Sequence, residues 1–197
     1  MVDVVSKLDR KETILRVAQI LFTQFGLAKT TIEDIARRAR MGKASIYYYF
    51  KSKEAIYQEV INKEGRELRR KILDAVSQET TPQRKIRTYV ITRMIMLKQL
   101  ANYYTAFRDE YLEQYVFIEK ARKEYNEFEI NLICSILQEG VAEGIFEVEN
   151  TELTAEVILA ALKGLEYHWT IHVPIETIEK NVDMLLNLLL RGIEKRS

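Results

Sequence analysis

Residues 30–56 read TTIEDIARRARMGKASIYYYFKSKEAI, and this stretch decides the fold. Thr30 followed by Glu33 is a capping-box pattern, in which each side chain satisfies a main-chain amide of the first turn of a helix. We therefore expect a short helix that ends near Ala39, and a second short helix over Lys43–Phe50. Two short helices joined by a tight turn are the outline of a helix-turn-helix, so the sequence predicts this motif.

The helix expected at Lys43–Phe50 carries three tyrosines, one serine and one lysine. In a helix-turn-helix the second helix enters the major groove of DNA, and the first helix braces it on the backbone. Phenol, hydroxyl and ammonium groups can contact phosphates, sugars and base edges there. A helix of this composition is also compatible with simple packing through its tyrosines. The spacing of the surrounding motif favours contact with DNA.

The segments on either side of this stretch also repeat with a helical period. Upstream, apolar side chains recur every three or four residues over residues 14–25, and Gly26 follows at a position typical of a helix end. Downstream, Ser52 can cap a long helix that runs to about Val76, and Pro82 suits the first turn of the next helix. The same periodicity continues along the chain, so the sequence predicts an all-α fold of about nine helices with no convincing strand.

Charge is distributed unevenly along the chain. Residues 1–53 carry 11 Lys and Arg against 5 Asp and Glu, whereas residues 54–197 carry 19 against 24. A basic segment joined to an acidic one favours contact between the basic segment and a polyanion, although windows of this size also vary by chance. The chain has one cysteine, no apolar run long enough to span a membrane and no signal-peptide pattern at its start, so we expect a cytoplasmic protein.

Residues 30–56 resemble the DNA-binding signature of the TetR family of transcription regulators, and residues 21–26 resemble the end of that family's first helix. The resemblance implies a helix-turn-helix DNA-binding domain over residues 1–52 and a helical effector-binding and dimerisation domain over residues 53–197. It further implies a homodimer that binds a palindromic operator in double-stranded DNA and responds to a small, hydrophobic effector, such as an acyl compound or a lipophilic drug. We expect a repressor released by its ligand, while ligand-enhanced binding or activation is equally allowed by the physics.

The resemblance also assigns residues to DNA contact. Thr31 and Lys53 correspond to positions that meet phosphate, and Tyr49 corresponds to a position near the backbone. The positions that face the groove are Lys43, Ala44, Ser45, Tyr47 and Tyr48. The chain departs from the family at the turn, where Arg40 replaces the usual glycine and Gly42 replaces the usual serine cap. In a left-handed backbone, arginine costs about 1 kcal/mol relative to glycine, and we expect Arg40 either to contact phosphate or to lie in solvent.

The rest of the chain contains an aromatic-rich stretch and two apolar helix faces. Aromatic side chains with polar tips suit an elongated, mostly apolar pocket, although such stripes equally form plain core. The residues expected to line an effector pocket are Tyr103, Tyr104, Phe107, Arg108, Tyr111, Tyr125, Phe128, His168 and Trp169. The last two helices are expected to form a dimer interface, although they could instead pack within one chain. The interface residues expected are Val157, Ala161, Gly164, Leu165, Val182, Leu185, Leu186 and Leu189.

Two other classes of protein compete with a regulator. The sequence contains no phosphate-binding glycine loop, dinucleotide fingerprint or zinc-protease motif, so we expect neither an enzyme nor a cofactor. His168 and His172 have a spacing that can bind a metal on one helix, but no matching Cys or His lies elsewhere, and we expect no metal. Cys134 lies in an apolar run and is expected to be an inert thiol. A helical scaffold would explain the helices, but not the capping box, the short helix pair and the basic segment in this order.

Overall fold

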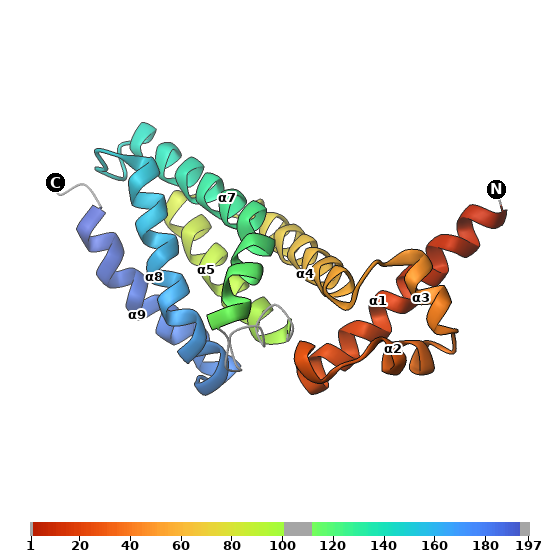
Figure 1. Ribbon diagram of the computed structural model, residues 1–197. Coiled ribbons are helices and arrows are strands. Elements are labelled where there is room, and N and C mark those ends of the chain that lie inside the picture. The colour runs from red at the N-terminus through yellow and green to blue at the C-terminus, as the bar shows by residue number, and fades with distance from the viewer. Residues whose placement is uncertain (1, 101–111, 194–197) are drawn as a thin grey trace. The chain divides into compact units, whose positions relative to one another are not determined.

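Eight helices make up this computed structural model, which describes residues 2–100 and 112–193 (Figure 1). They are α1 (Val2–Lys29), α2 (Ile32–Ala39), α3 (Lys43–Tyr49), α4 (Lys53–Val76), α5 (Pro82–Gln99), α7 (Leu112–Ala142), α8 (Thr151–His172) and α9 (Ile175–Ile193). No strand occurs in these ranges, so the predicted all-α fold is confirmed. None of the described helices has the length and apolar composition that crossing a membrane requires.

The chain divides into two compact units. Among the described residues, 2–65 and 112–122 form the head unit, and 66–100 and 123–193 form the body unit. α4 begins in the head unit and ends in the body unit, and Gly65 is its last residue in the head unit. α7 also has residues in both units, since its residues 112–122 belong to the head unit and the rest of it to the body unit.

The head unit has an apolar core that α1, α2, α3 and α4 build together. Its fully buried side chains include Phe22, Ile35 and Ile46. The rings of Phe22 and Tyr57 meet edge to face with their centroids 5.1 Å apart, which ties α1 to α4. Phe25 belongs to the apolar repeat of residues 14–25, but it is 48% exposed.

α1 ends differently from the sequence-based expectation. The backbone at Gly26 has φ 78° and ψ 167°, a conformation that glycine adopts readily and other residues rarely adopt. The predicted break at Gly26 is therefore present, but the chain resumes a helical turn after it and α1 ends at Lys29. Thr30 follows as a buried residue, and its Oγ1 donates a hydrogen bond of 2.8 Å to the main-chain oxygen of Gly26.

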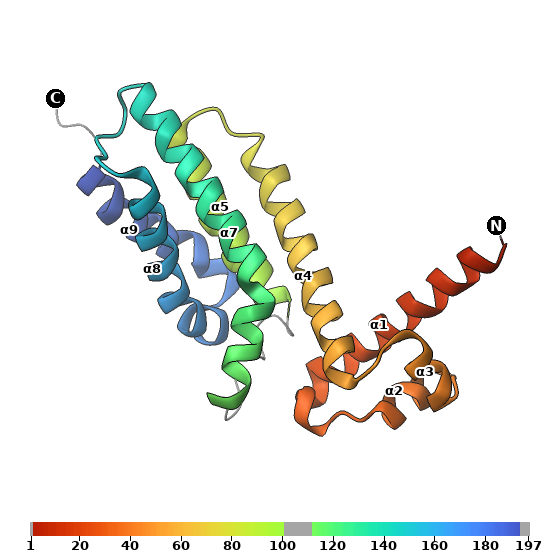
Figure 2. The same cartoon turned by 45° about the horizontal axis from the view of Figure 1, so that its top comes forward.

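The body unit is a bundle of α5, α8 and α9 with the second parts of α4 and α7 (Figures 1 and 2). α5 packs against both α8 and α9, and it buries Ile86, Val90, Met94 and Leu97. Ion pairs link its outer side to the neighbouring helices. Lys85 Nζ lies 2.5 Å from a carboxylate oxygen of Glu139 on α7, and a second pair joins α5 to α9.

The expected start of α5 is confirmed by its cap. Thr81 is the N-cap, its Oγ1 accepts a hydrogen bond from the Arg84 amide, and Pro82 occupies the first turn. α7 ends where Gly144 takes a φ of 70° and the chain turns back. The ring of Phe146 then packs so closely on Gly140 that a Cβ there would lie 2.1 Å from Phe146 Cδ2.

Candidate nucleic-acid interface

The capping box of α2 lies one residue later than the sequence predicted. Thr31 is the N-cap: its Oγ1 accepts a hydrogen bond of 3.1 Å from the Asp34 amide, and Asp34 Oδ2 accepts one of 3.2 Å from the Thr31 amide. The hydrogen bond from the Thr31 side chain lowers the pKa of the Asp34 carboxyl. The prediction of Thr30 with Glu33 is wrong because the Thr30 side chain is buried against α1.

The turn between α2 and α3 depends on a left-handed residue. Arg40 has φ 56° and ψ 41°, and it is the one non-glycine residue of positive φ in the described chain. The Met41 amide donates a hydrogen bond of 2.9 Å to the Ala36 carbonyl, which closes the end of α2. Gly42 has φ −70° and serves as the N-cap of α3 without a side-chain bond. Arginine, not the glycine, therefore adopts the conformation that favours glycine.

α3 points its polar side chains outward. Ile46 is its fully buried residue, and Phe50 at its end is 6% exposed. By contrast, Tyr47 is 48% exposed and Tyr48 is 67% exposed. Lys43 and Ala44 are also exposed, while Ser45 and Tyr49 are half-buried. Tyr47 and Tyr48 thus present much of their side chains to solvent, even though the Tyr48 ring packs edge to face on that of Tyr49 with centroids 5.0 Å apart.

Lys43 is connected to α2 by an ion pair. Its ammonium contacts the Glu33 carboxylate, and both side chains are largely exposed. The hydrogen bond from Lys43 lowers the pKa of Glu33, and the same bond raises the pKa of Lys43. The ammonium also lies 5.9 Å from the centroid of the Tyr47 ring. In the free protein this cation is therefore held between the two helices of the motif.

Lys53 has a structural contact that the sequence did not indicate. Its Nζ donates a hydrogen bond of 2.7 Å to the main-chain oxygen of Leu27, and a longer one of 3.4 Å to that of Ala28. These carbonyls belong to the last turn of α1, whose oxygens have no partner within the helix. A basic side chain at such a place stabilises the helix end. No local sequence motif predicts this contact, because Lys53 and Leu27 are 26 residues apart in the chain.

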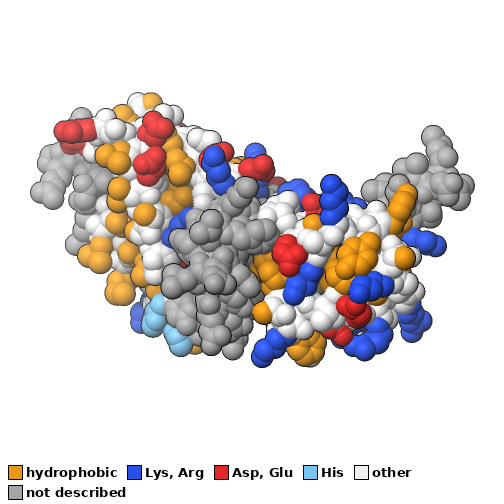
Figure 3. Space-filling view, viewed as in Figure 1, with side chains coloured by type: hydrophobic (Ala, Val, Ile, Leu, Met, Phe, Trp, Pro, Cys, Tyr) orange, Lys and Arg blue, Asp and Glu red, His pale blue; other side chains and the backbone are white. Residues whose placement is uncertain are grey.

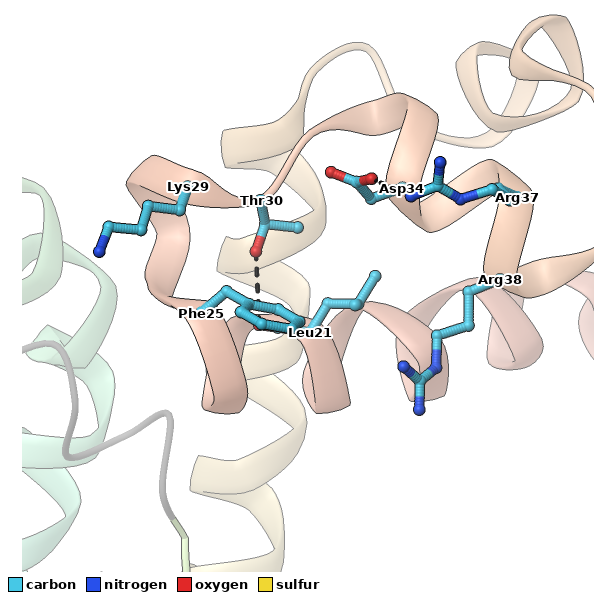
Figure 4. Close-up of a pocket in the computed structure, with 7 residues that line it drawn as sticks. All are labelled: Leu21, Phe25, Lys29, Thr30, Asp34, Arg37 and Arg38. Carbon is cyan, nitrogen blue, oxygen red and sulfur yellow. Dashed lines mark hydrogen bonds and ion pairs between the residues drawn. The ribbon is translucent and has the colours of Figure 1, made fainter.

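Three further cations surround a hollow in the head unit (Figure 4). The hollow has a volume of about 610 Å³ and lies between α1 and α2. Lys29, Arg37 and Arg38 are exposed at it, and its apolar wall is formed by Leu21 and Phe25. The sequence analysis did not single out these three cations, whose signal was only the basic charge of the segment. Basic side chains appear across the visible face of this unit in Figure 3.

The comparison with known proteins agrees with this geometry. Residues 14–60 match the family described as "Bacterial regulatory proteins, tetR family". The HTH-type transcriptional repressor KstR2 of Mycolicibacterium smegmatis is 30% identical to the chain over 142 residues, which cover 70% of this chain and 67% of that protein. The chain belongs to the TetR family. It is thus a member of a family of helix-turn-helix transcription regulators.

Solved structures of other regulators share the fold of this TetR-family chain. A transcriptional regulator from Cytophaga hutchinsonii is 25% identical, with a TM-score of 0.75 and coverage of 93% of this chain and 98% of that one. The regulator FadR from Bacillus subtilis, solved in complex with stearoyl-CoA, is 20% identical, with a TM-score of 0.76 and coverage of 92% and 98%. These likenesses extend over both units.

The structure describes only some of the residues predicted to line an effector pocket in this TetR-family chain. Tyr103, Tyr104, Phe107, Arg108 and Tyr111 lie outside the described residues. Tyr125 is buried and its ring centroid lies 5.8 Å from that of the half-buried Phe128. Trp169 is 8% exposed, whereas its neighbour His168 lies at the surface with His172. Among the residues searched, no group of three His, Cys, Asp or Glu side chains could hold a metal.

The dimer interface predicted for this TetR-family chain separates into two sets. Val157 is 60% exposed, Ala161 and Gly164 are exposed, and three further predicted residues are half-buried: Leu165, Leu185 and Leu189. Val182 and Leu186 are buried at 0% and 4%, so they belong to the interior of the body unit and the prediction for these two is corrected. α9 has one apolar side that is buried in the body unit and another that is exposed. The sequence alone did not show which apolar residues belong to which side.

The exposed apolar side of α9 carries residues that the sequence analysis missed. Met184 is 65% exposed and Leu188 is 73% exposed, one helical turn apart. In Figure 3 exposed hydrophobic side chains lie over α8 and α9.

Proposed function

We propose that the protein is a ligand-responsive repressor that binds a palindromic operator as a homodimer and is released by a small apolar effector. One observation carries the DNA-binding half of this proposal: α3 directs Tyr47 and Tyr48 into solvent while Ile46 anchors the helix in the core. We assign DNA binding to residues 1–52, and effector binding and dimerisation to residues 53–197. Such a regulator acts where the bacterial chromosome lies, in the cytoplasm.

The proposed DNA contacts divide into two kinds. Side chains of α3 enter the major groove, where Tyr47, Tyr48 and Ser45 reach base edges or thymine methyl groups and Ala44 allows close approach. The second kind contacts phosphate and orients the motif on the duplex. Its residues are Thr31, Arg40, Lys43 and Tyr49, with Lys53 contributing if its ammonium leaves the α1 carbonyls. The exposed side chains of Lys29, Arg37 and Arg38 extend the positive surface that binds the phosphate backbone of DNA.

A second copy of this chain is the proposed occupant of the apolar face of α8 and α9. Val157, Met184 and Leu188 are large apolar side chains that one chain leaves in water. Two helices from each subunit form a four-helix bundle, a common way to bury such faces. One head makes few base contacts, whereas two heads on a two-fold axis read half-sites about 34 Å apart. The dimer therefore supplies the affinity that one head lacks.

The repressor sign and the effector class rest on the relatives. KstR2, which is 30% identical, is named a repressor. FadR, which shares the fold, holds stearoyl-CoA, so a fold of this kind has room for an apolar chain. In this protein the buried aromatic residues of α7 and α8 support an apolar effector. Effector binding lowers the affinity for DNA by the ligand's preference for the non-binding state, and α4 is a covalent connection between the body unit and the head unit.

The first experiment is capture of genomic fragments from the source organism by the purified protein, with sequencing of the retained DNA at several salt concentrations. We expect one palindrome to be enriched, and the logarithm of affinity to fall steeply as the logarithm of salt concentration rises. No enrichment at low salt by folded protein, after extraction of any bound small molecule, would sink the proposal. Stronger retention in the presence of an apolar ligand would reverse the sign of regulation.

A pair of variants tests whether α3 is the reading helix. Tyr47→Ala with Tyr48→Ala removes only exposed rings, so we expect operator affinity to fall by at least about tenfold while the unfolding midpoint is unchanged. Ile20→Ala on α1 is the matched control, since it truncates a side chain that is 45% exposed in the same unit. Equal loss of affinity in the control, or unfolding of the tyrosine variant, would contradict the assignment.

The dimer is tested by introducing charge into its proposed face. Leu188→Glu puts a carboxylate at the most exposed large apolar residue of α9, so we expect monomers in analytical ultracentrifugation. Leu73→Glu on α4 is the control, because that leucine is also exposed, at 40%, but lies on another helix. If the Leu188→Glu variant sediments at the same rate as the unaltered protein, this face of α9 is not part of the interface.

A further inference from the structure

A network of charged side chains lies inside the body unit. Arg93 of α5 contacts two carboxylates: its Nε lies 2.6 Å from Glu129 Oε1 on α7, and its Nη2 lies 2.9 Å from Glu166 Oε2 on α8. The three side chains are 0%, 0% and 3% exposed. The hydroxyl of Tyr89 donates a further hydrogen bond of 2.6 Å to Glu129 Oε1. Four residues from three helices thus meet away from water.

The network is not complete by itself. Among the described residues, Arg93 Nη1, Glu129 Oε2 and Asn126 Oδ1 are buried and have no hydrogen-bond partner. Asn126 lies one turn before Glu129 on α7, so its amide belongs to the same side of the helix. A buried polar atom without a partner costs free energy of about 1–3 kcal/mol. These atoms offer one donor and two acceptors to a molecule that enters.

The charges of the network are also unequal. One guanidinium faces two carboxyl groups, so the group carries one negative charge in excess when both carboxyls are ionised. Burial lowers the pKa of Arg93, but Glu129 and Glu166 outweigh this and raise it, so the guanidinium keeps its charge. Burial, together with Glu129, holds the pKa of Tyr89 well above its ordinary value, so its phenol stays a donor.

Apolar side chains surround this polar group on the same helices. Leu97 lies one turn after Arg93, Ile133 one turn after Glu129, and Leu162 one turn before Glu166, and all three are at most 1% exposed. A molecule that reaches the network therefore meets a polar point within an apolar interior. In ligand sites generally, a few polar groups of this kind set the orientation of a mostly apolar molecule.

We propose that Arg93, Glu129 and Asn126 form the polar anchor of the effector site, and that they select an apolar molecule whose head donates hydrogen bonds, as a hydroxyl or a protonated amine does. A hydroxyl donates to Glu129 Oε2 and accepts from Arg93 Nη1. An ammonium donates to Glu129 and offsets the excess negative charge. A carboxylate head faces Glu129 unfavourably, and an ester carbonyl leaves Glu129 without a donor. The inference rests on the ligand response proposed above.

The chain's single tryptophan makes the test direct. Trp169 lies one turn after Glu166 on α8 and is 8% exposed, so its emission reports on this region. The unaltered protein is titrated with decylamine, 1-decanol, decanoate and methyl decanoate, each below the concentration at which it aggregates. The four share a ten-carbon chain and differ in the head. We expect decylamine and 1-decanol to bind at least about tenfold more tightly than decanoate and methyl decanoate, the scale of a hydrogen bond to a charged group.

Glu129→Gln tests the assignment to a residue. The substitution keeps the shape of the side chain, removes its negative charge and exchanges one carboxylate oxygen for an amide nitrogen. We therefore expect the preference for decylamine over decanoate to fall to within about threefold. Glu127→Gln is the matched control, because it removes the same charge from α7 at a side chain that is 60% exposed, and the preference should persist. If Glu129→Gln fails to fold, the four-ligand comparison on the unaltered protein still decides.

Three outcomes overturn the anchor: decanoate or methyl decanoate binding as tightly as the donor heads, no change in Trp169 emission with any of the four compounds, or an unchanged preference in folded Glu129→Gln. Operator binding by the same preparation is measured separately. If the protein still binds its operator but shows no preference among the four ligand head groups, only the proposed polar anchor is contradicted. Loss of operator binding counts against the proposed function instead.

Discussion

Lys53 Nζ donates a hydrogen bond of 2.7 Å to the main-chain oxygen of Leu27, so the first residue of α4 holds the last turn of α1. We expect Lys53→Ala to lower the free energy of unfolding by about 1 kcal/mol, as measured by urea denaturation, because the carbonyl loses a charged donor. Lys51→Ala is the control, since that lysine is exposed and precedes α4. A drop in the salt dependence of DNA binding by about one unit, without loss of stability, would show a phosphate contact instead.

The ion pair between Glu33 and Lys43 competes with phosphate for the same ammonium. Glu33→Gln releases Lys43, so we expect operator affinity to rise several-fold and to depend more steeply on salt, as measured by fluorescence anisotropy at several salt concentrations. Glu12→Gln, which releases Lys63 from a similar exposed pair, is the control. Unchanged affinity in Glu33→Gln would mean that Lys43 does not reach phosphate.

Arg40 combines a strained backbone with an exposed cation. Arg40→Gly relieves the left-handed conformation, and we expect the free energy of unfolding to rise by about 0.5–1 kcal/mol in urea denaturation. The same change removes a positive charge, so operator affinity should fall. Arg40→Ala separates the two effects, since it keeps the strain and loses the charge. Operator affinity that survives both substitutions would assign Arg40 to solvent.

Gly164 offers a test of the proposed dimer interface. A Cβ at this position meets nothing within 4 Å in the single chain, so Gly164→Ala leaves the subunit folded and stabilises the helix. In a dimer whose backbones approach there, the added methyl weakens association, and we expect the dimer dissociation constant to rise by about tenfold. Gly140→Ala, where the Phe146 ring occupies the space, should instead destabilise the fold in the same denaturation assay.

A pair of charges between α5 and α9 predicts a dependence of stability on pH. The hydrogen bonds from Arg87 lower the pKa of Asp183, so the carboxylate stabilises the folded protein above the ordinary Asp pKa of about 3.9. That contribution is lost as the pH falls through the lower pKa of the folded state. Because both side chains are partly exposed, we expect Asp183→Asn to cost about 0.5 kcal/mol at pH 7. The two proteins should converge in urea denaturation at low pH, and a difference that persists there would have another origin.

The sequence predicted the helix-turn-helix because its signals are local. The resemblance to the TetR family identified Arg40 as the residue in place of the usual glycine, but it did not establish a left-handed backbone there. The capping box was shifted by one residue, because Thr30 with Glu33 and Thr31 with Asp34 satisfy the same pattern. Only the burial of Thr30 against α1 distinguishes the two registers. Tertiary contact decides such cases, and a single sequence does not show it.

The features that the sequence did not predict join residues far apart in the chain. Lys53 reaches α1 across 26 positions, and Arg93 meets carboxylates 36 and 73 positions away. Periodicity identifies an apolar face but not which neighbour covers it. The sequence therefore placed Leu186 of α9 in the interface and did not single out Leu188, whereas the structure buries Leu186 and exposes Leu188. The sequence pattern likewise does not predict that charged residues of α5, α7 and α8 are buried.

α4 is a rod of 24 residues, which at about 1.5 Å per residue is about 36 Å long. If one end of such a rod tilts by about 5°, the other end moves by about 3 Å, the length of a hydrogen bond. A displacement of that size at Lys53 is enough to break direct contacts to a phosphate. In the proposed regulator α4 acts as a lever: a shift in the body unit no larger than a side-chain rearrangement displaces Lys53 far enough to weaken the binding of the head unit to DNA.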